Sequence, residues 1–177
     1  MKLRVVDTNV ILAANGAHAE ISEECMASCI VELFELKSSG VVVIDDCYRI
    51  LNEYQNKTNN KKGKGAGDVF LKWLLQNNAN VKRCHQVTLT ELEENKYLEF
   101  PVPALEEVFD APDRKFAAVA NVHPQKPNIL QAADCKWLDW SDELGKTGIK
   151  VDFICRVDVL RFYKKKFPGK VQPKLHE

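Results

Sequence analysis

The sequence predicts an α/β protein in which a central parallel sheet lies between two layers of helices. Two short apolar runs, residues 3–6 and 41–44, read as strands, and segments with helical spacing of apolar residues follow each of them. The connections between successive strands are long enough for right-handed crossovers, which parallel strands require. Together these observations favour a three-layer α/β/α architecture.

The first half of the chain alternates strands and helices. The strand at 3–6 precedes a predicted helix at 21–38, and Gly40 is suited to end that helix. The continuous apolar run 41–44 is typical of a strand covered on both faces. Asp45 or Asp46 can cap the next helix. Its apolar residues recur at helical spacing: Cys47, Ile50, Leu51 and Tyr54.

The pattern continues through the second half. We expect a short helix at 67–76, a strand at 81–89 and a helix that starts within 110–113, where a proline suits the first turn. A strand at 128–133 and a short helical element at 137–144 follow. The last two predicted elements are a strand at 148–155 and a basic helix at 157–167.

The 177 residues are enough for one domain, and a composition of 45% hydrophobic and 28% charged residues predicts a globular fold. We expect a single domain over residues 1–177, with a basic loop at about 57–65 and a basic C-terminal extension at about 156–177. The formal net charge of zero hides an asymmetry. Residues 91–110 carry seven acids and one lysine, and they could bind a basic partner or the basic tail of the chain itself.

The six cysteines show no Cys-x-x-Cys spacing, so we read them as small buried hydrophobic residues rather than zinc ligands or a disulfide framework. No apolar run is long enough for a signal peptide or a membrane span. The expected location is therefore the cytoplasm.

Four acids recur where one predicted element gives way to the next: Asp7, Glu53, Asp113 and Asp134. Strand ends of parallel sheets are where such folds hold ligands, and grouped carboxylates suit Mg²⁺ or Mn²⁺. Each acid also has a structural interpretation. Asp7 fits a turn, Glu53 fits a helix ion pair with Arg49 or Lys57, and the other two fit helix N-termini.

These residues resemble the motifs of the PIN-domain nuclease family. The segment Val5-Val6-Asp7-Thr8-Asn9-Val10 is similar to the opening motif of the family, and Glu53 matches its glutamate. The helix that starts at Asp113 and the strand that ends at Asp134 are similar to its third and fourth acidic motifs. The resemblance covers roughly residues 3–155.

The resemblance implies a metal-dependent endoribonuclease that hydrolyses single-stranded RNA. Asp7, Asp113 and Asp134 would be the primary ligands of Mg²⁺ or Mn²⁺, and Glu53 would bind the ion or orient water. Additional candidates for the site are Thr8, Asn9, Asp110 and Asp139. An acidic pocket repels a polyanion, so basic residues elsewhere must contact phosphate. These candidates are Lys57, Lys61, Lys62, Lys64, Arg161, Lys164, Lys165 and Lys166.

Three other interpretations stay open. The chain could be a catalytically silent PIN-like module that binds RNA or protein, or the toxin of a toxin–antitoxin pair with an antitoxin partner. A phosphatase of the haloacid dehalogenase type also begins with an Asp at a strand end. That chemistry needs a second Asp two residues later, where this chain has Asn9. A homodimer is compatible with the family resemblance.

Overall fold

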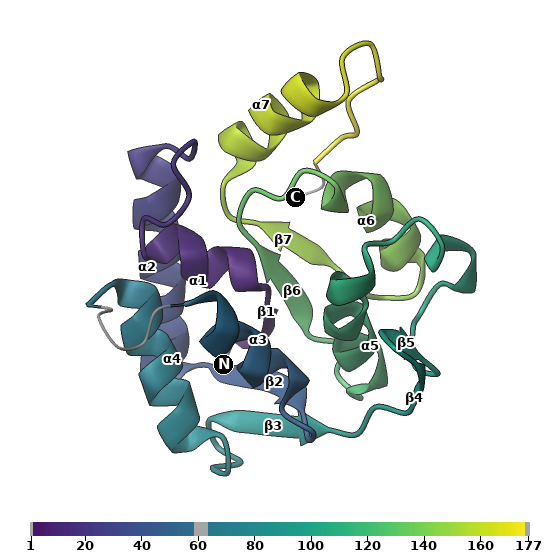
Figure 1. The fold of residues 1–177 in the computed structure, drawn as a ribbon. Coiled ribbons are helices and arrows are strands. Elements are labelled where there is room, and N and C mark those ends of the chain that lie inside the picture. Colours follow the sequence, from purple (N-terminus) through teal and green to yellow (C-terminus); the bar gives the residue numbers. More distant parts are fainter. Residues whose placement is uncertain (1, 59–63, 176–177) are drawn as a thin grey trace.

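The computed structural model describes residues 2–58 and 64–175. Within them, five strands form one parallel sheet in the order β3-β2-β1-β6-β7. The strands are β1 (Leu3–Val6), β2 (Val41–Asp45), β3 (Cys84–Val87), β6 (Asn128–Gln131) and β7 (Val151–Phe153). Helices α2 and α4 lie on one side of the sheet, and α5 and α6 lie on the other (Figure 1). The predicted three-layer α/β/α class is confirmed.

The helices of the described residues follow the predicted periodicity closely. Helices α2, α4, α6 and α7 begin and end within two residues of the predicted bounds, because their buried residues recur at helical spacing. The full set is α1 (Thr8–Ala14), α2 (Glu23–Ser39), α3 (Arg49–Lys57), α4 (Ala66–Asn77), α5 (Arg114–Val122), α6 (Trp137–Lys146) and α7 (Arg156–Lys166).

Helix α1 was not predicted, because it begins directly after β1 with no loop between them. The Asp7 side chain caps it by accepting a hydrogen bond from the backbone N–H of Asn9 at 2.8 Å. Helix α3 also starts later than expected. Asp45 still supports it, since its carboxylate accepts from the backbone N–H groups of Arg49 and Ile50, but the residue before the helix is Tyr48 in a left-handed conformation.

Three strands are shorter than predicted. In β6 and β7 apolar burial continues past the paired residues, whereas Val81 before β3 is exposed in a turn. Strand β7 pairs only with β6, from Val151 opposite Ile129 to Phe153 opposite Gln131. Ile149 lies outside the strand, yet it is fully buried. The predicted bounds 81–89, 128–133 and 148–155 are therefore too wide, since apolar character reports burial rather than strand pairing.

The acidic region 91–110 forms a small antiparallel hairpin of β4 (Glu91–Glu93) and β5 (Lys96–Tyr97), followed by a 3₁₀ turn, η1 (Pro103–Leu105). A second turn, η2 (Ala111–Asp113), takes the place of the predicted helix start, and α5 begins only at Arg114. Aromatic packing anchors this region, with Phe109 stacked on Trp140 at a centroid distance of 4.0 Å. Glu91 pairs with Arg49 at 2.8 Å rather than with the basic tail.

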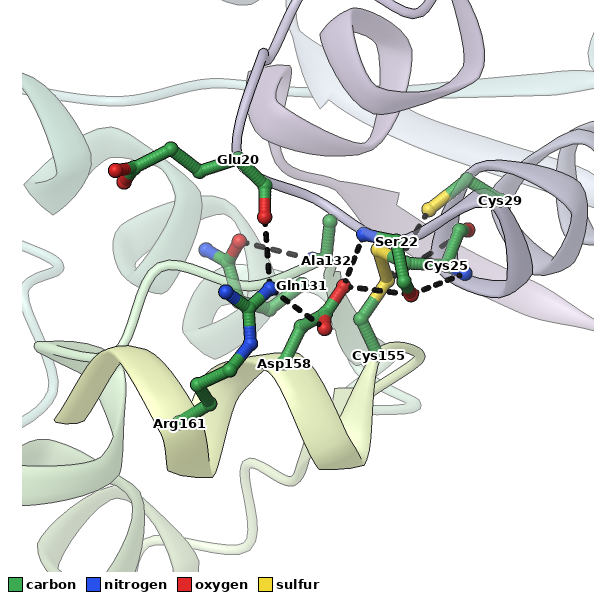
Figure 2. Close-up of a disulfide and its surroundings, with 9 residues drawn as sticks. All are labelled: Glu20, Ser22, Cys25, Cys29, Gln131, Ala132, Cys155, Asp158 and Arg161. Carbon is green, nitrogen blue, oxygen red and sulfur yellow. Dashed lines mark hydrogen bonds and ion pairs between the residues drawn. A yellow bond between two sulfur atoms is a disulfide. The ribbon is translucent and has the colours of Figure 1, made fainter. Parts of the chain in front are cut away.

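The cysteine prediction is wrong at two points. Cys25 and Cys155 form a disulfide between the first turn of α2 and the residue before α7 (Figure 2). Their separation of 130 residues leaves no local spacing signal. Cys47 is exposed, whereas the remaining three free cysteines are buried as expected: Cys29, Cys84 and Cys135.

Among the described residues, no helix combines the length and the apolarity needed to cross a membrane.

Candidate functional site

The order of strands reverses between β1 and β6. From β1 the chain adds β2 and β3 on one side, and it then returns to place β6 and β7 on the other side of β1. In open α/β sheets, ligands bind outside the carboxyl ends of the strands at such a reversal. Asp7 directly follows β1, and Asp134 comes three residues after β6. Both candidates therefore lie at the position that this topology favours.

Asp7 is almost completely buried, with 2% of its surface exposed. Its own backbone N–H donates to the carbonyl of Leu130 in β6, which ties the residue to the strand reversal. Burial raises the pKa of Asp7 to about 7, against the opposing hydrogen bond from Asn9, and the charges of Asp134 and Glu53 raise it further. The turn interpretation holds for the Asn9 contact, but it does not account for this loss of solvent.

Glu53 projects from α3 toward the same place. Thr8 donates a hydrogen bond to one of its carboxylate oxygens, and the ammonium of Lys115 donates to the other. The predicted helix ion pair of Glu53 is wrong. Arg49 pairs instead with Glu91 and Asp45, and among the described residues Glu53 pairs with Lys115 rather than with Lys57. Glu53 is therefore an oriented carboxylate with 19% of its side chain exposed, not a solvated surface group.

Asp113 ends the turn η2 immediately before α5. Its side chain makes no capping hydrogen bond, so the helix-terminus interpretation gains no support from the geometry. Burial raises its pKa to about 8, and the charges of Asp7, Asp134 and Glu53 add to the effect against that of Lys115.

Asp134 accepts a hydrogen bond from the backbone N–H of Lys136 at 3.1 Å, as an acid beside a helix start does. Burial raises its pKa, and the Lys136 N–H and the charge of Lys166 oppose that rise. Its side chain is 18% exposed. Its negative charge in turn raises the pKa of both Asp7 and Asp113.

The structure thus gathers four acids from four separate segments, and we call Asp7, Glu53, Asp113 and Asp134 the acid cluster. In the described parts of the chain, no three of them bring carboxylate oxygens within 4.8 Å of one another. Direct ligation of one ion by three of them would need side-chain rotation. The Asp113 side chain can rotate without breaking a capping hydrogen bond, because it makes none. The oxygen donors and their mutual repulsion fit a hard divalent cation.

The additional candidates divide into two groups. Thr8 and Asn9 contact the acid cluster, since the hydroxyl of Thr8 donates to Glu53 and the backbone N–H of Asn9 donates to Asp7. Asp110 lies at its edge, in an ion pair with Lys136. Asp139 is engaged elsewhere: one oxygen accepts from Tyr163 at 2.6 Å and the other from Lys170 at 2.7 Å.

Two lysines of the site were missed by the sequence interpretation. Lys115 is buried in α5, where its ammonium contacts Glu53 and the carbonyl of Pro112. Lys136 reaches Asp110, and its nitrogen is 3.9 Å from Asp134. The available signal was that Lys115 directly precedes the apolar run Phe116–Ala120, and a lysine in such a setting is expected to be buried only with a partner.

A cavity of about 530 Å³ adjoins the acid cluster. Asn9 and Asp134 line it on the side of the sheet, and α7 contributes Phe162, Lys165 and Lys166. Lys136 also lines it, and burial and the nearby charge of Lys166 lower the pKa of Lys136. Acidic and basic groups therefore share one cavity wall.

The predicted phosphate-binding residues are only partly placed beside this cavity. Lys165 and Lys166 line it, but Lys165 pairs with Glu20 at 2.7 Å. Arg161 donates to the carbonyl of Glu20. Lys164 is exposed on α7 and does not line the cavity. The loop candidates are Lys57 and Lys64, which are exposed away from it, and Lys61 and Lys62, which lie outside the described residues.

Comparison with family models, curated proteins and solved structures gives no match for this chain, so the interpretation of the site depends on its geometry and on the motif resemblance.

Proposed function

We propose that the chain is a divalent-metal-dependent endoribonuclease that hydrolyses phosphodiester bonds of single-stranded RNA. One observation carries the proposal. Three aspartates from distant segments, Asp7, Asp113 and Asp134, meet at the strand reversal. Burial raises the pKa of each, and the charge of Asp134 raises the pKa of the other two further. Perturbed acids gathered beside a cavity are typical of a functional site. The choice of RNA comes from the PIN resemblance.

The donor set fits Mg²⁺ or Mn²⁺, since it consists of carboxylates. Asp7, Asp113 and Asp134 would hold the ion. A bound divalent ion would supply Lewis-acid activation of water and stabilisation of the charge that develops on the phosphoryl oxygens.

The remaining steps belong to the side chains of the chain itself. Thr8 and Lys115 fix the orientation of Glu53 by occupying one lone pair on each of its oxygens. The second lone pair of each oxygen can accept a hydrogen bond from water and so align it for attack. Lys115 also limits the repulsion between Glu53 and Asp113, whose pKa it lowers.

The adjoining cavity supplies a place for the nucleotide next to the cleaved bond. Lys136 and Lys166 are near enough for the charge of one to lower the pKa of the other, and an anion between them would relieve that repulsion. They could bind a phosphate of the RNA backbone while the cleaved phosphate faces the acid cluster.

Cleavage of generic single-stranded RNA with Mg²⁺ or Mn²⁺ tests the proposal. We expect the wild type to cleave, a chelator to abolish cleavage, and Asp113→Asn to lower the rate roughly 10³-fold through loss of a metal ligand. Glu94→Gln is the control, because it removes one carboxylate at an exposed position outside the acid cluster. Equal rates for wild type and Asp113→Asn would refute the assignment.

A second candidate is the catalytically silent RNA- or protein-binding module, which the Lys115–Glu53 ion pair favours. An internal ammonium already contacts one carboxylate of the cluster and so supplies part of the positive charge that an ion would bring. Titration with Mn²⁺ separates the two candidates. The nuclease binds Mn²⁺ as wild type and loses this binding in Asp113→Asn, whereas the silent module binds none.

A further inference from the structure

Three cysteines meet where α7 joins the rest of the fold, and we call Cys25, Cys29 and Cys155 the cysteine cluster. Cys25 and Cys29 are one turn apart on α2, and Cys155 immediately precedes α7. All three are buried, with sulfur atoms within 4.8 Å of one another. Figure 2 shows the Cys29 side chain directed toward the disulfide that joins the other two.

The sulfur of Cys29 lies 3.7 Å from that of Cys155, which is contact distance for two sulfur atoms. A bond between them would require the two atoms to approach by about 1.7 Å, since a disulfide bond measures roughly 2.0 Å. Cys155 is therefore in contact with two sulfur partners on the same face of α2, one bonded and one free.

We propose that the cysteine cluster is a thiol–disulfide exchange site in which Cys155 bonds either to Cys25 or to Cys29. In the exchange, the Cys29 thiolate attacks the sulfur of Cys155. The Cys29–Cys155 bond forms as the Cys25–Cys155 bond breaks, and Cys25 leaves as a thiolate that takes up the proton lost by Cys29. One disulfide replaces another, so no oxidant or reductant is consumed.

The surroundings favour the Cys25-bonded form as the main one. Asp158 of α7 accepts hydrogen bonds from the backbone N–H and the hydroxyl of Ser22, just before α2. Arg161 donates to the carbonyl of Glu20, so α7 is also held to the segment before α2 (Figure 2). Burial raises the pKa of the Cys29 thiol to about 12, with a further contribution from the charge of Glu32. Cys29 is therefore a protonated thiol at neutral pH, and exchange is slow.

The exchange would transfer the bond of Cys155 to a residue one turn further along α2, and it requires the sulfur atoms of Cys155 and Cys29 to approach by about 1.7 Å. Because α7 contributes Phe162, Lys165 and Lys166 to the cavity, its wall would shift with it. A shift of the cavity wall would change RNA binding only if the proposed function is correct. The exchange itself can be measured without RNA, so the two proposals fail separately.

Disulfide mapping by mass spectrometry of the oxidised, folded chain tests the exchange, after free thiols have been blocked at acidic pH. In Cys25→Ala we expect most molecules to contain the Cys29–Cys155 bond. Cys84→Ala is the control, because it removes another buried free thiol and should leave the Cys25–Cys155 bond in place. Free Cys29 and Cys155 in folded Cys25→Ala would overturn the proposal.

A time course with the wild type decides the matter if Cys25→Ala does not fold. A peptide pair joined through Cys29 and Cys155 should accumulate as a minor species over hours, the ordinary range for uncatalysed rearrangement. It should be absent from Cys29→Ala. If the wild type yields no more of this pair than Cys29→Ala does, the exchange does not occur.

Discussion

The acid cluster and the cysteine cluster are two buried groups of titratable side chains, and each is assembled from distant segments. In the acid cluster, burial and the charges of Asp134 and Glu53 raise the pKa of both Asp7 and Asp113, which are left to share protons or an external cation. In the cysteine cluster, Cys25 and Cys155 satisfy each other through a covalent bond, and Cys29 remains a neutral thiol. A buried positive charge would therefore stabilise the acid cluster, whereas the cysteine cluster has no negative charge to neutralise. The acid cluster is therefore the better candidate for binding a ligand.

Removal of the disulfide should have the largest effect on stability. A link across 130 residues restricts the unfolded chain strongly, so we expect Cys155→Ala to lower the free energy of unfolding by about 2–5 kcal/mol. Urea denaturation measures this change. Cys84→Ala provides the comparison for the loss of one buried thiol without a bond, and equal losses in the two variants would contradict a stabilising role of the disulfide.

The acid cluster should make stability depend on pH in the opposite sense from ordinary paired acids. The pKa values of Asp7 and Asp113 are higher in the folded chain than their usual value near 3.8. Between about pH 4 and pH 8 the folded chain therefore holds protons that the unfolded chain has released. In chelator, the free energy of unfolding should fall as pH rises, by at most about 1.4 kcal/mol per pH unit for each group.

Asp113→Asn should flatten this slope and raise stability at pH 8, because the amide carries no charge to bury. Denaturation midpoints between pH 5 and pH 8 measure both effects, and Glu94→Gln, at an exposed position, should keep the wild-type slope. A variant that gains stability while losing cleavage would show that Asp113 serves chemistry rather than folding. If Asp113→Asn kept the wild-type dependence of stability on pH, the pKa of Asp113 would not be raised in the folded chain.

The smallest expected effect concerns the cavity wall. Lys166→Ala should weaken binding of single-stranded RNA about 3- to 10-fold in chelator. It should also reduce the slope of log affinity against log salt concentration by about 0.7, the value for one phosphate contact. Fluorescence anisotropy at several salt concentrations measures both. Lys164→Ala removes the same charge from α7 at a position that does not line the cavity. Equal effects of the two substitutions would show that Lys166 contributes only nonspecific electrostatic attraction and no contact in the cavity.

The local pattern of the sequence was enough for the architecture. Apolar periodicity located β1, β2 and four of the helices closely, because the burial of a strand or helix face repeats along neighbouring residues. The same pattern failed at Ile149, which is buried without being paired in the sheet, and at α1, which needs only the Asp7 cap to begin. Strand pairing and caps depend on neighbours that periodicity does not record.

The sequence by itself therefore determined the α/β class, and it marked Asp7, Asp113 and Asp134 as acids at the ends of elements. Only the tertiary structure decided that they share one space, that Lys115 is paired with Glu53, and that Cys155 meets Cys25 and Cys29. The physical reason is distance along the chain. Helix and strand propensities act over a few residues. The Lys115–Glu53 ion pair and the disulfide join residues 62 and 130 positions apart, and they form only when the sheet brings its helices together.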